Sequence, residues 1–125
     1  MSKRNDFIRQ TFEVRYEYSV AFTNHLFEPK NQTLREVLQK AGEKCHRVLV
    51  CIDSGVYAHW PHLPKMINAY AQQNKDVMEN VCEPVIIQGG ESCKNNPHLL
   101  AQLHRKVADE GIDRHAFIIA IGGGA

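Results

Sequence analysis

The class of structure follows from one short run, Arg47-Val48-Leu49-Val50-Cys51-Ile52, which ends at Asp53-Ser54-Gly55. In a strand with one solvent-exposed face, apolar residues alternate with polar ones. The apolar residues of this run do not alternate. An unbroken apolar run is typical of a strand buried on both faces, in a parallel sheet covered by helices. We therefore predict a central parallel strand over residues 46–52, ended by a polar loop.

Two more apolar runs lie downstream, and helical patterns separate the three. The runs are Pro84-Val85-Ile86-Ile87-Gln88, closed by Gly89-Gly90-Glu91, and residues 116–121, which lead into Gly122-Gly123-Gly124. Trp60, Leu63, Met66, Ile67 and Tyr70 recur at helical spacing, and two prolines confine that predicted helix to about residues 64–74. A second amphipathic helix is predicted over residues 97–110, with Gly111 as its stop.

A further helix is predicted upstream of the first of these strands. Thr33, with Glu36 three residues later, forms a capping box that would start it. Gly42 would end it.

The N-terminal part has a different pattern. Residues 1–10 are polar and mixed in charge, and we expect a flexible lead-in. Phe12, Val14, Tyr16, Tyr18, Val20 and Phe22 then alternate with mostly polar residues. A period of two predicts a half-buried strand, or a hairpin of two strands.

Strands that alternate with amphipathic helices predict a Rossmann-like α/β domain over residues 11–125, with a mostly parallel sheet and flanking helices. The length of 125 residues suits one domain. Hydrophobic residues make up 43% and charged residues 23%, and these ordinary globular values exclude intrinsic disorder, collagen and coiled coil.

Charge and hydropathy narrow the possible partners and compartment. The net charge of +1 shows no basic excess, so we expect no nucleic-acid binding. No apolar signal region opens the chain, and no apolar run approaches the ~18 residues of a membrane span, so we expect a cytoplasmic protein that does not cross a membrane. The four cysteines match no zinc-site spacing and are expected to be free thiols.

The candidate site lies at the three predicted strand ends, because ligands of open α/β sheets bind outside the carboxyl ends of the strands. Asp53 could accept hydrogen bonds from ribose hydroxyls, or it could cap the following segment. Glu91 and Lys94 could bind a sugar hydroxyl and a phosphate, or form a solvated ion pair. The glycines at 122–124 could bring backbone N–H groups to a pyrophosphate, or they could form a loose tail.

The seven histidines give no metal-binding pattern, because no HExxH motif or carboxylate cluster accompanies them. Packing or surface roles are expected for them. No motif supports a Ser-His-Asp triad.

Taken together, Asp53, Gly90-Glu91-Ser92-Cys93-Lys94-Asn95 and Ile121-Gly122-Gly123-Gly124 resemble the N-terminal domain of 3-dehydroquinate synthase, a sugar phosphate cyclase. The opening Tyr18-Ser19-Val20-Ala21-Phe22-Thr23 is similar to the first strands of these enzymes. The resemblance covers about residues 12–125. Lys94-Asn95 and this opening look closer to the valiolone-type cyclases than to the housekeeping enzyme.

The resemblance implies an NAD-binding domain. Asp53 would contact the adenosine ribose, Gly90, Glu91 and Lys94 the cofactor, and Gly122, Gly123 and Gly124 the pyrophosphate. Family enzymes oxidise a sugar phosphate transiently with NAD, eliminate phosphate, reduce the ketone and close a carbocycle by aldol reaction. A zinc or cobalt ion is held in a helical C-terminal domain, and family members are commonly homodimers.

The chain departs from the family pattern at its end, since it stops inside the glycine motif. The resemblance therefore implies a fragment without the metal-binding domain, with no catalytic residue of its own and no turnover alone. Two alternatives remain open. One is an oxidoreductase like the iron-containing alcohol and glycerol dehydrogenases, which share the architecture, and the other is a non-catalytic nucleotide-binding module.

Overall fold

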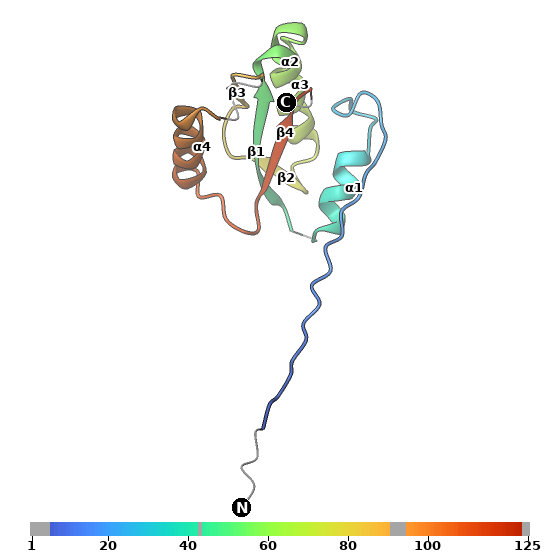
Figure 1. Ribbon diagram of the computed structural model, residues 1–125. Coiled ribbons are helices and arrows are strands. Elements are labelled where there is room, and N and C mark those ends of the chain that lie inside the picture. Colours follow the sequence, from blue (N-terminus) through green and yellow to red (C-terminus); the bar gives the residue numbers. More distant parts are fainter. Residues whose placement is uncertain (1–5, 43, 91–94, 124–125) are drawn as a thin grey trace, which may run out of the picture.

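The computed structural model describes residues 6–42, 44–90 and 95–123. Within these ranges, four α-helices and four strands follow one another in a largely alternating order (Figure 1). They are α1 (Thr33–Lys40), β1 (His46–Asp53), α2 (Ser54–His59), α3 (Leu63–Gln73), β2 (Met78–Asn80), β3 (Val85–Ile87), α4 (Pro97–Asp109) and β4 (Phe117–Ile121).

The sheet is built around β1, and every strand pairs with β1 in parallel. β2 pairs with its first half and β3 with its second half, so these short strands share one edge of β1. β4 pairs along Val48 to Ile52 and therefore occupies the opposite edge. The predicted Rossmann-like α/β class is confirmed.

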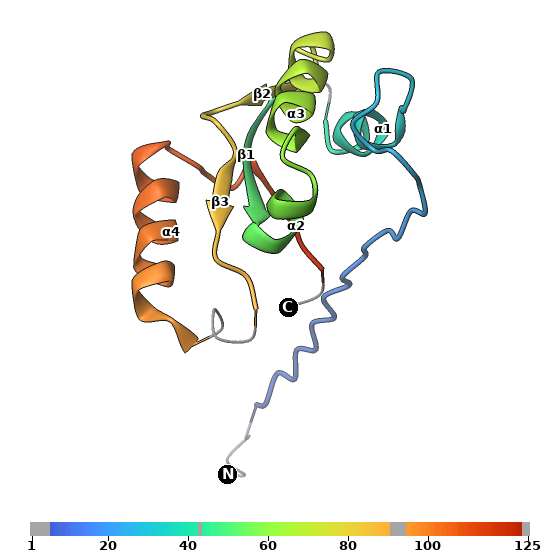
Figure 2. The same ribbon diagram turned by 90° about the horizontal axis from the view of Figure 1, so that it is seen from above.

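The two crossover connections run in opposite directions from this centre. Helices α2 and α3 lead from β1 to β2 and β3, whereas α4 leads from β3 back past β1 to β4. Right-handed crossovers in opposite directions place their helices on opposite faces of the sheet. Accordingly, β1 and β3 lie between α4 and α3 (Figure 2).

The core lies on the sheet face that α1 and α3 cover. Val48, Val50 and Ile52 of β1 are at most 2% exposed and pack in one cluster with side chains from both helices. That cluster includes Leu38, Ile67, Tyr70 and Met78. The other face is covered less completely, because α4 buries no side chain fully and Ile118 of β4 is 54% exposed.

Most predicted elements are confirmed within one or two residues, including α3, α4, β3 and β4. Two short elements, α2 and β2, have no counterpart among the predictions. The predicted start of α1 is partly wrong: the helix does begin at Thr33, but Gln32 is the N-cap and makes no side-chain capping bond. Gly42 follows the helix end as predicted, with its N–H bonded to the Gln39 carbonyl.

The predicted N-terminal strand or hairpin is not formed. Residues 6–22 carry no regular structure, and the segment extends away from the body of the domain (Figure 1). Its six alternating apolar side chains are 69% to 96% exposed. An alternating pattern forms a strand only where a neighbouring strand offers its backbone groups. Among the described residues, none of the four strands pairs with this segment.

Candidate functional site

The three predicted strand ends meet at one edge of the sheet. Asp53, the last residue of β1, is level with Ile87 of β3, and its neighbour Ile52 is level with Ile121 of β4. Gln88-Gly89 therefore leaves the sheet on one side of Asp53, and Gly122-Gly123 leaves it on the other. The described parts of these segments thus lie together at the carboxyl edge of the sheet, where the sequence analysis placed the candidate site.

Asp53 is fixed by its capping role. Its Oδ1 accepts a hydrogen bond from the Gly55 N–H at 2.8 Å, which makes it the N-cap of α2. The neighbouring Ser54 Oγ accepts a bond from the Gly89 N–H at 3.2 Å and ties the β3 loop to the start of α2. Among the described residues, no group donates to Asp53 Oδ2, so this oxygen is available for a ligand.

Gly89 is the site residue that sequence reasoning missed, because the prediction named Gly90 instead. A Cβ at Gly89 would lie 1.9 Å from Asp53 Oδ1 and 2.4 Å from its Cγ. Only a glycine lets the β3 loop approach the carboxylate this closely. The sequence feature that could have identified it is its position, because Gly89 lies two residues beyond the last residue of β3.

The other named glycines differ in their surroundings. Gly90 has φ of +101°, a conformation that favours glycine, and a Cβ there would meet nothing within 4 Å. Gly122 lies against Asp53, with 3.9 Å between a Cβ at position 122 and the Asp53 Cβ, whereas Gly123 faces open space. The predicted site residues Glu91, Lys94 and Gly124 lie outside the described residues.

Two hollows open beside Asp53. One of about 140 Å³ lies over the strand ends, lined by Asp53, Gln88, Gly89 and Gly122 together with apolar strand residues. The other, of about 330 Å³, is lined by Asp53, Gly55, Val56, His59, Trp60 and Gly123. Among the described residues, neither hollow is lined by a lysine or arginine. The donors available to a ligand are therefore backbone N–H groups and the neutral side chains of Gln88, His59 and Trp60.

Cys51 lines the smaller hollow but is suited to packing rather than to nucleophilic chemistry. Its side chain is 7% exposed, and burial raises the pKa of its thiol. A thiol of raised pKa stays protonated and is a weak nucleophile. The predicted core role of Cys51 is confirmed.

Trp60 and Met66 share the predicted helical spacing with Ile67 and Tyr70, but their surroundings in the structure differ. Trp60 is 68% and Met66 41% exposed, whereas Ile67 and Tyr70 are buried. The reason is that Trp60 precedes α3 and lies in the corner between α2 and α3, so the helical spacing does not extend to it. Its indole lines the larger hollow instead of the core.

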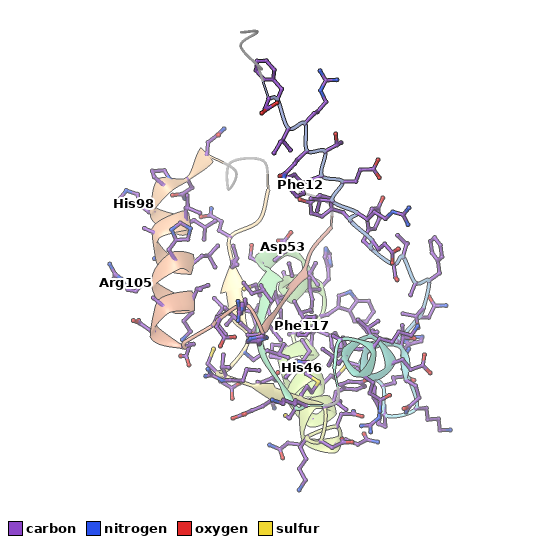
Figure 3. The ribbon with its side chains drawn as sticks, turned by 90° about the horizontal axis from the view of Figure 1, so that it is seen from below. Phe12, His46, Asp53, His98, Arg105 and Phe117 are labelled. Carbon is purple, nitrogen blue, oxygen red and sulfur yellow. The ribbon has the colours of Figure 1, made fainter. Side chains whose placement is uncertain are left out.

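A hollow of about 800 Å³ lies at the opposite end of the sheet, around His46, Arg114 and Phe117. His46 has a structural role there: its Nε2 lies 3.0 Å from the Leu38 carbonyl oxygen, and its ring packs edge-on against Phe117 (Figure 3). Ligands of open α/β sheets bind at the carboxyl end, where Asp53 lies, so we assign the site to that edge.

The described residues contain no group of three or more His, Cys, Asp or Glu side chains placed to hold a metal ion. No helix within the described ranges is long and apolar enough to cross a bilayer. No family model, curated protein or solved structure matches the chain. The arrangement of Asp53 and the two glycine loops is therefore the basis for assigning a function.

Proposed function

We propose that the chain is the NAD-binding domain of a sugar phosphate cyclase similar to 3-dehydroquinate synthase. The observation that carries this proposal is the meeting of Asp53 with Gly89 and Gly122 at the carboxyl edge of the sheet. The same loops carry the residues in which the sequence resembles that family. In the full enzyme, the substrate would be a sugar phosphate and the assembly a homodimer.

The order of the strands supports a nucleotide at this place. From β1 the chain passes to β2 and β3 on one edge of the sheet, and from β3 it returns past β1 to β4 on the other edge. The direction of the connections therefore switches between β1 and β4. Such a switch point leaves a crevice outside the strand ends, where open α/β sheets bind nucleotides. Asp53 and Gly122 come from the two strands that flank this point.

The residues present fit the adenosine and pyrophosphate part of NAD. Asp53 Oδ2 would accept hydrogen bonds from ribose hydroxyls, while Oδ1 keeps its bond to the Gly55 N–H. Gly122 and Gly123 would donate backbone N–H groups to the pyrophosphate, and the absent side chains leave room for its oxygens. By resemblance, Gly90, Glu91, Lys94 and Gly124 would complete the contacts.

NAD supplies reversible hydride transfer when it is bound, and the zinc or cobalt ion of the family is assigned by resemblance to a separate helical domain. The described part of this chain therefore contributes binding and orientation rather than catalytic groups. Its hollows beside Asp53 would hold the cofactor against the rigid ends of β1 and β4.

Calorimetric titration with NAD tests the proposal, using the 125-residue chain and Gly123→Val. A Cβ at Gly123 meets nothing within 4 Å, and Gly123 is not among the positive-φ residues, so valine is compatible with the fold. We expect the isopropyl group to keep phosphate oxygens away from the N–H groups and to weaken NAD binding by about tenfold or more.

Ala108→Val on the exposed side of α4 is the matched control, and it should bind NAD like the wild type. Equal heats for the wild type and Gly123→Val would remove the glycine loop from the proposal. No heat for the wild type with NAD would overturn the proposal itself.

A further inference from the structure

The larger hollow beside Asp53 shares part of its lining with a second, largely apolar hollow. The second hollow measures about 350 Å³ and is formed by the loop around Leu26 and by the α2–α3 corner. Both hollows are lined by His59 and Trp60. The same indole therefore borders both hollows and places an aromatic surface beside the hollow that Asp53 and Gly123 line.

The backbone that carries the indole is held in place, although the side chain itself is largely exposed. The Trp60 N–H donates to the Val56 carbonyl at 2.9 Å, and the Trp60 carbonyl accepts from the Leu63 N–H at 3.0 Å. Pro61 follows directly and restricts the backbone further. An exposed tryptophan on a fixed backbone loses little conformational freedom when a flat ligand stacks on it.

We infer that Trp60 is the surface on which the adenine ring of the bound nucleotide stacks. This inference rests on the proposed function, since it takes Asp53 as the ribose contact and Gly123 as a phosphate contact. A base attached to a ribose at Asp53 must lie beside the same hollow. Among the residues that line the hollow, Trp60 alone offers an extended aromatic face.

The second hollow explains why a base would bind at this point rather than stay in bulk water. Leu26, Leu63 and Met66 give its walls an apolar character, and Met66 is 41% exposed there. A base on the indole would shield part of this apolar surface from water, which is favourable in proportion to the area covered. The ring nitrogens of His59 and His62 could bond with polar edges of the base.

Fluorescence and calorimetry together test the inference on the 125-residue chain. Trp60 is the only tryptophan, so selectively excited tryptophan emission reports on this position alone. We expect NAD and adenosine monophosphate to quench the emission, and nicotinamide mononucleotide to leave it nearly unchanged. In calorimetry, Trp60→Ala should weaken the binding of adenosine monophosphate by roughly ten- to a hundredfold.

Two variants separate stacking from a general structural effect. Trp60→Phe keeps an aromatic face and should retain most of the affinity. Tyr57→Ala removes another exposed aromatic of α2 that lines neither hollow, and it should bind like the wild type. Because the Trp60 side chain is 68% exposed, all three variants should keep the circular dichroism spectrum of the wild type.

The possible failures can be told apart. If NAD gives calorimetric heat but leaves the emission unchanged, and Trp60→Ala binds as tightly as the wild type, the stacking role is wrong and the proposed function stands. If no adenine nucleotide gives heat with the wild type, the proposed function and the stacking role both fail.

Discussion

The two oxygens of the Asp53 carboxylate have separate tasks. Oδ1 caps α2 through the Gly55 N–H, and Oδ2 is the atom proposed to meet the ribose. The sequence allowed both roles for this residue, and the capping role is confirmed. The ribose role stays a prediction that substitution can isolate, because an amide can cap a helix as well as a carboxylate can.

We predict that Asp53→Asn and Asp53→Ala differ in stability but not in NAD affinity. Asn keeps the cap, so its free energy of unfolding should stay close to that of the wild type, whereas Ala should lose about 1 kcal/mol. Both should bind NAD roughly tenfold more weakly or worse, because both lose a charged acceptor for the ribose hydroxyls. Urea denaturation and calorimetry measure the two effects.

Asp113→Asn offers a comparison away from the site, since Asp113 also accepts a local backbone N–H, that of His115. It should leave NAD binding unchanged. Wild-type affinity for NAD in Asp53→Asn would show that the carboxylate charge does not contact the cofactor.

Gly89 illustrates what residue types alone could not predict. The run Gly89-Gly90-Glu91 indicated a tight loop but not which glycine faces another chain segment. That distinction depends on the register between β1 and β3, which sets Asp53 level with Ile87. Long-range strand register is not encoded in the local pattern of either segment. The folded chain is therefore needed to show that a side chain at position 89 would collide with Asp53.

At the scale of elements, apolar runs and amphipathic periods were predictable, whereas α2 and β2, which have neither, were not. The apolar runs of β1 and β3 and the amphipathic pattern of α4 gave bounds correct to within one residue. The helix α2 has six residues and β2 three, too few for a period to emerge. β2 is stabilised by its pairing with β1, and α2 by its local cap at Asp53.

Helix α1 is joined to the rest of the domain by Arg35. Its guanidinium Nη1 donates to Asp76 Oδ1 at 2.7 Å and to the Asn74 side chain at 3.2 Å. Its backbone N–H donates to the Tyr70 hydroxyl at 3.3 Å, and that hydroxyl donates to the Asn31 carbonyl. The hydrogen bonds from Arg35 are the main cause that lowers the pKa of Asp76.

We predict that this pair makes stability depend on pH in the acid range. Because the pKa of Asp76 is lower in the folded chain than in the unfolded chain, its contribution is complete above the unfolded value of about 3.9. It is lost as the pH falls from there through the folded value. Between about pH 5 and pH 2.5, the melting temperature should therefore fall more steeply with decreasing pH for the wild type than for Asp76→Asn.

Asp109→Asn on the exposed side of α4 is the matched control, and its melts should follow those of the wild type. Parallel curves for the wild type and Asp76→Asn would mean that the ion pair does not hold α1 in solution. Because Asp76 is largely exposed, added salt should reduce the difference.

At the scale of the whole molecule, coverage of the sheet is uneven. The α1 and α3 side contains the buried cluster, whereas Ile86, Leu100 and Ile118 remain 40% to 55% exposed. Sequence patterns indicated which residues are apolar but not how closely α4 would pack. The same limit explains the N-terminal segment, whose alternation indicates a capacity to pair without indicating a partner.

We predict that removing residues 1–22 leaves the stability of the domain unchanged. Residues 6–22 are exposed throughout, whereas the loop that follows is anchored, because the Asn31 side chain donates to Thr23 Oγ1 at 2.8 Å and to the Asn24 carbonyl at 2.9 Å. A cut before Thr23 therefore spares every hydrogen bond of that loop. Calorimetric melting of the two chains should give the same midpoint within about 2 °C, less than a loss of 1 kcal/mol would cause.

A second truncation, of residues 1–31, provides the contrast. It also removes Phe27, which is 8% exposed and packs edge-on against Tyr70, so the midpoint should fall clearly. If removal of residues 1–22 alone lowered the midpoint by several degrees, the alternating segment would be part of the folded domain in solution. Its apolar side chains would then pack on the sheet as the sequence pattern predicts.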